Sequence, residues 1–198
     1  GFTPKRSTLD NLLRLSQEIN DGFINDEFTV AIFFDLEKAF DKIHQGAIIL
    51  KLQELNIKGR MLSFLTDFLN SRTFKIRLGN HISTSRIQET GVPQGSVVSP
   101  LLFNLVLIGI ENCLHKKVNY SLYADDLAIF SRGRNISMLT EHLQQSINKL
   151  VLWYKHRGLN FSVAKTKAVI FTRKRIIPLT PNLNLNDTPI PIENTVKF

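Results

Sequence analysis

Two adjacent aspartates, Asp125 and Asp126, stand between two apolar runs in the stretch YSLYADDLAIF, residues 120–130. The flanking runs predict two strands, and the Ala-Asp-Asp segment between them predicts a turn. Carboxylates side by side repel each other unless a cation neutralises them. Aspartate is also common in solvated turns, so the pair alone permits two interpretations, a solvated turn or a cation site.

The order of the predicted elements brings a third carboxylate to this pair. With residues 37–98 set aside as an insertion, the elements are a strand at 28–35, a helix at 99–116, the two hairpin strands, a helix at 137–157 and a strand at 167–172. This is the order of a split β-α-β-β-α-β unit, whose first two strands are parallel and end at one sheet edge. Asp35 ends the first strand, so we expect it beside Asp125 and Asp126.

Three carboxylates at one edge would need counter-ions. Hard oxygen ligands suit Mg²⁺, which keeps positions open for water and phosphates. Two such ions about 3.5–4 Å apart can clamp the attacking and leaving oxygens of a phosphoryl transfer. The sequence therefore favours metal ligands over a solvated turn.

Other segments carry clear start and stop signals. STLDNLLRLSQEINDG predicts a helix, and two more are expected near 44–57 and 59–70. TFKIRLGNHISTSRI predicts a hairpin that turns at Gly79-Asn80, and the prolines within 176–192 predict a connection. We expect Ser99 to cap the helix to about Lys116, and Ser137 to cap a helix that runs to Arg157 and stops at Gly158.

Composition fits a folded intracellular domain. The chain has 198 residues, 43% of them hydrophobic, and its one cysteine excludes a disulfide framework and favours a reducing compartment. The longest apolar run, residues 97–110, is too short to span a bilayer, and we see no signal peptide. We expect no membrane association.

The positive charge is concentrated in one half. The net charge is +8, and no acidic residue occurs between Glu141 and Asp187, an interval that holds eight Lys and Arg residues. A solvated basic face would explain this, but a polyanionic partner explains it better, because phosphates usually face a patch of one sign.

Four ordered segments resemble the motifs of a known family. FFDLEKAFDKIHQ, GVPQGSVVSPLLFNL, YADD and GLNFSVAKTKAVIF are similar, in this order, to the palm motifs of reverse transcriptases of the non-LTR (LINE-like) retrotransposon branch. GFTPKRSTLDNL resembles that branch's fingers segment, and FLNSRTFKIRLGNHIS resembles its insert before the PQG loop. The resemblance covers nearly the whole chain. It implies an α+β polymerase palm with a split β-α-β-β-α-β, ferredoxin-like sheet and a helical and hairpin insertion.

The resemblance assigns roles by position. Asp35 and Asp125 match metal-binding aspartates, Asp126 is their neighbour, and the Leu36 carbonyl is expected on the metal at the nucleotide side. Phe40 matches an aromatic sugar gate, the alternative being a core phenylalanine. Gln94 and Gly95 match residues that line the nucleotide pocket, where glycine permits close backbone approach. Lys165 matches a lysine near the leaving pyrophosphate, the alternative being a solvated lysine.

The sequence departs from the family pattern in places. Ser162 stands where asparagine is usual, and we assign Asp41 no metal role because it could cap the following helix. The chain ends at Val196–Phe198, where a primer-grip hairpin would begin, and only Lys5 and Arg6 remain as cationic fingers contacts. We therefore expect a partial fingers segment at 1–27, a palm at 28–175 with an insertion at 44–90, and a connection at 176–198.

The resemblance implies an RNA-directed DNA polymerase core that acts in retrotransposition. Its expected cofactors are two Mg²⁺ ions, with Mn²⁺ as the alternative, and its expected partners are an RNA template, a DNA primer, dNTPs and the rest of a longer retrotransposon polyprotein. We expect Lys155, Arg157 and Lys174 to contact nucleic acid, and the nucleus to be the site of action. The alternative is a truncated or domesticated copy that binds nucleic acid without catalysis. A nucleotidyl cyclase would share the sheet but would lack PQG followed by a helix.

Overall fold

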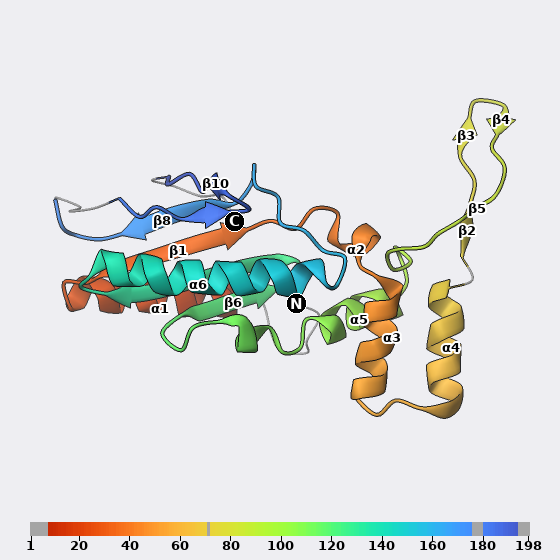
Figure 1. The fold of residues 1–198 in the computed structure, drawn as a ribbon, viewed down its shortest axis with the longest axis horizontal. Helices are drawn as coiled ribbons and strands as arrows, with labels where there is room; N and C mark the ends of the chain where they lie inside the picture. Colours follow the sequence, from red (N-terminus) through yellow and green to blue (C-terminus); the bar gives the residue numbers. More distant parts are fainter. Residues whose placement is uncertain (1–7, 71, 176–179, 194–198) are drawn as a thin grey trace. The chain divides into compact units, whose positions relative to one another are not determined.

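The computed structural model describes residues 8–70, 72–175 and 180–193 (Figure 1). The chain divides into two compact units. We call them the sheet unit, which comprises the described residues within 1–37, 109–155 and 160–198, and the helical unit, residues 38–108 and 156–159. No described helix is both long and apolar enough to cross a membrane.

The sheet unit is built on four strands in the order β6-β7-β1-β8. They are Asn119–Tyr123 (β6), Asp126–Gly133 (β7), Phe28–Phe34 (β1) and Lys167–Phe171 (β8). Both β6 and β1 pair antiparallel with β7, and β8 pairs antiparallel with β1. Strands β1 and β6 therefore run parallel to each other on either side of β7, and both end at the same sheet edge.

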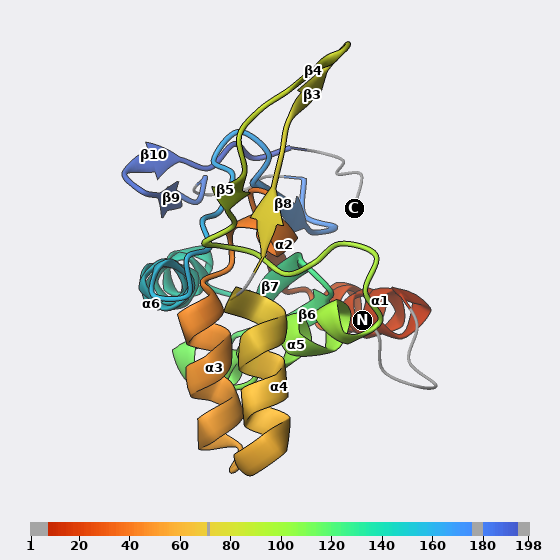
Figure 2. The same ribbon diagram turned by 90° about the vertical axis from the view of Figure 1, so that its right-hand side faces the viewer.

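Central position explains why β1 has no polar face. All seven of its residues, FTVAIFF, are buried. On one face Ala31 and Phe33 pack with Leu15 of helix α1 (Thr8–Ile24) and with Phe130. Helix α6 (Ile136–Lys155) contacts β7 and β1, and Figure 2 shows α1 and α6 on opposite sides of the sheet. A strand covered on both faces is expected to be almost entirely apolar, and Thr29 is the one polar residue of β1.

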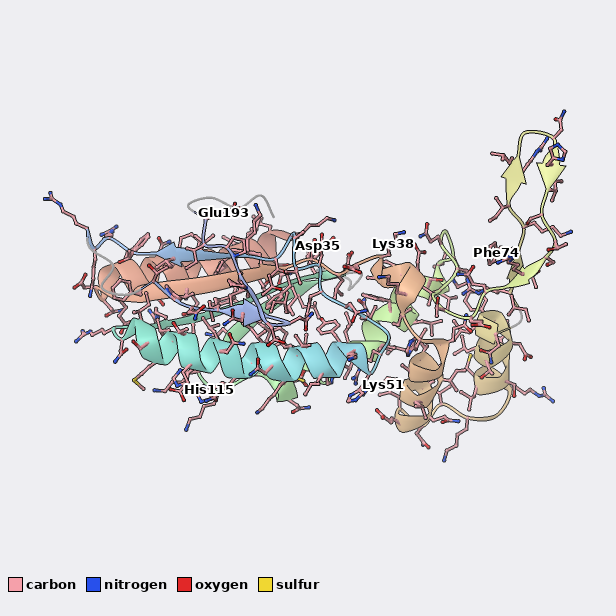
Figure 3. The ribbon with its side chains drawn as sticks, turned by 45° about the horizontal axis from the view of Figure 1, so that its top comes forward. Asp35, Lys38, Lys51, Phe74, His115 and Glu193 are labelled. Carbon is pink, nitrogen blue, oxygen red and sulfur yellow. The ribbon has the colours of Figure 1, made fainter. Side chains whose placement is uncertain are left out.

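The end of the described chain covers the outer edge of β8. The backbone N–H of Ala168 donates to the Pro191 carbonyl, and that of Glu193 donates to the Ala168 carbonyl. Glu193, which is labelled in Figure 3, also forms an ion pair with Lys167. Within the expected connection, two short strands form, Asn184–Leu185 (β9) and Thr188–Pro189 (β10). Covering β8 in this way hides backbone groups that could otherwise pair with another chain.

The described residues of the helical unit form four helices and a long hairpin. The hairpin runs from β2 to β5, turns at Gly79 with φ +59°, and leaves Phe74 and Leu78 exposed (Figure 3). Its elements are Ala39–Lys42 (α2), Gln45–Glu54 (α3), Gly59–Asn70 (α4), Thr73–Phe74 (β2), Arg77–Leu78 (β3), His81–Ile82 (β4), Arg86–Ile87 (β5) and Val98–Val106 (α5). The two predicted helices and the predicted hairpin are thus confirmed.

The helix predicted at 99–116 is wrong in length. Helix α5 ends at Val106, and a separate 3-10 turn follows at Ile110–Cys113. Gly109 lies between them with φ +100°, a left-handed conformation that an α-helix cannot contain. Ser99 does not cap the helix but lies inside it, and its hydroxyl donates to the Pro93 carbonyl at 2.6 Å.

The cap and end predicted for the long helix of the sheet unit are also wrong. The side chain of Asn135 caps α6, because its Oδ1 accepts from the backbone N–H groups of Ser137 and Met138. Ser137 is already helical, and α6 ends at Lys155 rather than at Arg157. Asparagine and serine are equally good cap residues, so neighbouring candidates cannot be ranked from type alone.

Candidate active site

The register of β1 on β7 places Asp35 beside Asp126. Phe34 pairs with Leu127, so the next position along β1 is Asp35 and its neighbour across the ladder is Asp126. Strand β6 returns into β7 through a two-residue turn, Ala124-Asp125, in which Ala124 adopts φ +53°. The three aspartates therefore occupy one edge of the sheet unit.

The surroundings of Asp126 affect its ionisation. The pKa of Asp126 is raised above its ordinary value, first by partial burial of the carboxyl group, then by the charge of Asp125 and then by that of Asp35. Each cause disfavours the charged form of Asp126. A cation at this edge would remove the repulsion, so the site is electrostatically suited to bind one.

From this raised pKa we predict how the free energy of unfolding of the metal-free protein depends on pH. A carboxyl group with a higher pKa in the folded state destabilises the fold once pH rises through its unfolded value, about 3.9 for Asp. We expect Asp126→Asn to raise the free energy of unfolding at pH 7, by less than about 1 kcal/mol because the charge is partly solvated. The gain should fade as pH drops below about 4, where the carboxyl is protonated in both states.

Urea unfolding in the presence of a chelator, at pH 7 and pH 3.5, measures this difference. Asp187→Asn is the matched control, because Asp187 is an exposed carboxylate of the same unit and has φ +62°, a conformation that asparagine tolerates. A gain for Asp126→Asn that is equal at both pH values would contradict the raised pKa of Asp126.

A tight turn brings Lys165 to the same edge from far along the chain. The backbone N–H of Ser162 donates to the Asp35 carbonyl at 2.8 Å, and that of Glu37 donates to the Asn160 carbonyl at 2.9 Å. The Lys165 Nζ atom then lies 3.3 Å from Asp35 Oδ2. The lysine side chain is 68% exposed, so this ion pair stabilises the fold little and can exchange for other partners.

Leu36 lies at the centre of this attachment. It forms an antiparallel bridge with Phe161 and is buried. The two hydrogen bonds of the bridge use the Asp35 carbonyl and the Glu37 N–H, so the Leu36 carbonyl is not involved in it. The predicted role of that carbonyl on a metal stays a prediction.

The three carboxylates are chemically suited to bind a hard divalent cation. Asp35 closes β1 (Figure 3), and with the Asp125 and Asp126 carboxylates it supplies oxygen ligands of the kind that Mg²⁺ prefers. Among the described residues, however, no three His, Cys, Asp or Glu side chains are gathered tightly enough to form a ready coordination set. The carboxylates thus fit divalent ions by type and charge, while Asp35 is paired with Lys165.

In the helical unit, Phe40, Gln94 and Gly95 line one pocket of about 320 Å³. The Phe40 ring is half-buried and stacks on Phe103, with ring centroids 4.6 Å apart. Gly95 has φ +83°, which favours glycine. The structure thus brings together these three predicted residues, and the Phe40 ring reaches a surface that a ligand can contact.

One further residue of this pocket region was not predicted to act there. Asp41 Oδ1 accepts a hydrogen bond from Gln94 Nε2 at 2.8 Å, which fixes the orientation of the amide. Gly91 brings the loop close, since a Cβ there would lie 2.6 Å from the Asp41 carbonyl oxygen. The glycine before VPQG was the available signal, because glycine is typical where two backbone segments touch.

The predicted nucleic-acid contacts do not form one cluster within either unit. Lys174 lies in the sheet unit, 3.5 Å from Asp26 and over the Phe28 ring. Lys155 is exposed in the same unit, whereas Arg157 belongs to the helical unit and donates to the Val106 carbonyl. Lys5 and Arg6 lie outside the described residues.

Comparison with known proteins settles the family. A model described as "Reverse transcriptase (RNA-dependent DNA polymerase)" matches residues 1–196. The chain belongs to the reverse transcriptase family. Reverse transcriptases generally use divalent metal ions.

Curated relatives of this reverse transcriptase domain come from mobile elements. A probable RNA-directed DNA polymerase from transposon BS of Drosophila melanogaster is 29% identical over 204 residues, which cover 100% of this chain and 22% of the relative. A Pol polyprotein from retrotransposable element R2 of Popillia japonica is 26% identical over 212 residues, covering 100% of this chain and 29% of the relative. The chain thus spans less than a third of these relatives.

Solved telomerase structures share the fold of this reverse transcriptase domain. Apo telomerase from Candida tropicalis, truncated from its C-terminal domain, matches with a TM-score of 0.64 and 14% identity over 88% of this chain and 37% of its own. Telomerase from Candida albicans, in complex with a TWJ fragment of telomeric RNA, gives 0.63 and 12% over 92% and 32%. At this identity the likeness concerns the mixed α/β fold alone.

Proposed function

We propose that the chain is the polymerising core of an RNA-directed DNA polymerase. The observation that carries the proposal is the meeting of Asp35, Asp125 and Asp126 at one sheet edge, with the Lys165 amine on Asp35, in a chain matched by the family model over residues 1–196. The reaction is attack of a primer 3′-hydroxyl on the α-phosphate of a dNTP. Pyrophosphate leaves, and the primer grows by one nucleotide.

The three carboxylates and the Leu36 carbonyl would hold two Mg²⁺ ions, with Mn²⁺ as an alternative. When bound, such ions neutralise the carboxylates and stabilise charge on the reacting phosphate. The raised pKa of Asp126 supports this assignment, since burial of the carboxyl group and then the charges of Asp125 and Asp35 disfavour its ionised form, which a bound cation would favour. Lys165 can leave Asp35 for the pyrophosphate, because its exposed side chain forms only a weak ion pair. There its ammonium group would balance the charge of the leaving group.

Residues of the helical unit would select the nucleotide. The Phe40 ring would exclude a ribose 2′-hydroxyl by steric contact. The side-chain amide of Gln94, which donates a hydrogen bond to Asp41, would contact the nucleotide. Gly95 would allow the backbone to approach it. Support comes from the shared pocket of about 320 Å³, which lies within the usual size range of ligand sites.

We propose that residues 28–175 form a polymerase palm, in which the four-stranded sheet with α5 and α6 makes the split β-α-β-β-α-β unit. The strand order β6-β7-β1-β8 supports this, although α5, the first crossover helix, clusters in the helical unit and packs on α3 there. The functional boundaries at 27/28 and 175/176 and the insertion at 44–90 remain part of the same proposal.

The proposed partners are an RNA template, a DNA primer and the rest of a longer retrotransposon polyprotein. The mobile-element origin of the relatives and the chain's small share of their length support this. Lys155, Arg157 and Lys174 would contact phosphates, with Lys155 the most accessible of the three. Retrotransposition joins the product to genomic DNA, so we place the activity in the nucleus.

Metal removal tests the proposed function. The full-length protein, given an RNA template, a DNA primer and dNTPs, should extend the primer with Mg²⁺ and stop when a chelator is added. Nucleic-acid binding should persist, because Lys and Arg contacts to phosphate do not need the site metals. Binding without extension at any Mg²⁺ or Mn²⁺ concentration would instead support the alternative, a copy that binds nucleic acid without catalysis.

A further inference from the structure

A small cavity of about 150 Å³ lies in the sheet unit between α1 and the hairpin of β6 and β7, which carries Asp125 and Asp126. The hairpin side is lined by Tyr123 and Asp126, which pair directly across the ladder, and by Ser121 and Ala128. Ser121 also pairs with Ala128. Directly paired residues and residues two apart share one face of a sheet, so these four side chains form one wall. Two of them are small, which leaves the space.

Helix α1 forms the opposite wall and is held in place. It contributes Asn11, Leu12 and Leu15, with Leu15 buried in the core and Leu12 52% exposed at the surface. The Asn11 Nδ2 atom donates to the Leu122 carbonyl at 3.3 Å, which attaches the helix to β6 beside the cavity. A second bond, from Asn119 Nδ2 to Glu18 Oε1 at 3.1 Å, fixes the helix further along.

The lining combines apolar walls with one anionic group. Leucine, alanine and the tyrosine ring supply flat apolar contact, and the Asp126 carboxylate supplies a charged acceptor. An engineered apolar cavity of about 150 Å³ in another protein binds benzene, so a volume of this size can hold one aromatic ring. Asp125 and Asp35 add negative potential at this position, which favours a cation over a neutral or anionic molecule.

We propose that this cavity binds a compact aromatic cation, with its ring packed on Leu12 and Leu15 between the two walls and its charged N–H groups on Asp126. An amidinium on a single ring has the required shape, because its two parallel N–H groups match the two oxygens of a carboxylate. Binding of such a molecule does not require that the chain polymerises DNA. If the proposed function also holds, the bound cation occupies Asp126, one of the three carboxylates that would hold the metals, and inhibits primer extension.

Benzamidine is the probe, titrated into the 198-residue chain without nucleotides, nucleic acid or metal and followed by calorimetry or NMR. We expect saturable binding with a Kd on the order of a millimolar, as suits a ligand of so few atoms. Neutral benzamide should bind at least about tenfold more weakly, because it lacks the charge-assisted hydrogen bonds. Because the assay contains no substrate, an inactive polymerase would leave its outcome unchanged.

Two substitutions locate the site. Asp126→Asn should weaken benzamidine binding at least about tenfold. Leu12→Ala should weaken it roughly three- to tenfold by removing one apolar wall, whereas Leu13→Ala should not change it. Leu13 is the matched control because it is the next residue of α1, is 58% exposed, and does not line the cavity. Both leucines are largely exposed, so both variants should fold, which thermal melting verifies.

Three results would overturn the proposal. They are no saturable binding up to tens of millimolar benzamidine, unchanged affinity in Asp126→Asn, and equal losses in Leu12→Ala and Leu13→Ala.

Discussion

Replacement of Asp35 or Asp125 by Asn is expected to abolish primer extension on an RNA template while nucleic-acid binding persists. Each substitution removes a charge from the edge that would hold the metals but keeps the size of the side chain. Deletion of one preorganised charge stabiliser typically costs roughly a hundred- to a thousandfold in rate, and a lost metal ligand should cost at least that much. Extension by the full-length protein with Mg²⁺, and binding in a separate assay, measure the two effects.

Asp187→Asn is the matched control for these variants. It makes the same chemical change at an exposed position of the sheet unit, so it should leave both extension and binding unchanged. Thermal melting should show that Asp35→Asn and Asp125→Asn remain folded, since neither side chain is buried. Extension near the wild-type rate in either variant would mean that the carboxylates do not hold a catalytic metal.

The placement of Asp35, Asp125 and Asp126 at the same end of the sheet could be predicted because it depends on strand direction alone. A buried strand that ends at Asp35 and a hairpin that turns at Asp125 fix which end of the sheet each residue reaches. The register that pairs Phe34 with Leu127, and so sets Asp35 across from Asp126, needed no fine detail of packing. Burial along β7 does not alternate, since residues 127–131 are all buried, so the two-residue turn that pairs Tyr123 with Asp126 sets the register of the hairpin.

The approach of Lys165 to Asp35 could be anticipated only from the family resemblance. It depends on hydrogen bonds between backbone groups, from the Ser162 N–H to the Asp35 carbonyl and from the Glu37 N–H to the Asn160 carbonyl. Backbone groups are the same in every residue, so neither bond leaves a pattern in the sequence. Serine at position 162 provides the bond as well as asparagine would, because the donor is the main chain.

Local signals misplaced helix ends for a related reason. Residues 99–116 contain apolar residues at helical spacing, yet Gly109 takes a left-handed conformation and separates α5 from the 3-10 turn. Glycine is tolerated inside helices, so its presence alone did not predict a break. Ser99 satisfies the Pro93 carbonyl of the PQG loop instead of a helix end, a tertiary contact that overrides its cap preference.

Side-chain contacts between loops were the least predictable part of the site. Asp41 orients Gln94, but the two residues are 53 positions apart and either could have faced solvent. The cavity beside Asp126 is a remainder of packing between α1 and the hairpin, and depends on small residues meeting at one point. Such volumes are set by the sum of neighbouring side chains rather than by any motif.

Removal of the Phe40 ring is expected to admit ribonucleotides without greatly harming dNTP use. A phenyl ring beneath the sugar discriminates by steric clash with the 2′-hydroxyl, so Phe40→Val should leave the deoxyribose contacts in place. An overpacked contact of this kind plausibly costs on the order of 1–3 kcal/mol. Since about 1.4 kcal/mol corresponds to a tenfold change, the ratio of rNTP to dNTP incorporation efficiency should rise roughly ten- to a hundredfold.

The stacking of Phe40 on Phe103 supplies the control that separates a gate from a core residue. Phe103 is fully buried, whereas the half-buried Phe40 ring lines the pocket. Phe103→Leu should therefore lower the melting temperature, by creating a cavity, and leave the incorporation ratio unchanged. Phe40→Val should lose less stability than Phe103→Leu but raise the ratio. If Phe40→Val instead lowers stability and depresses both activities together at a constant ratio, Phe40 is a core residue that supports Phe103, and nucleotide selection depends on other residues.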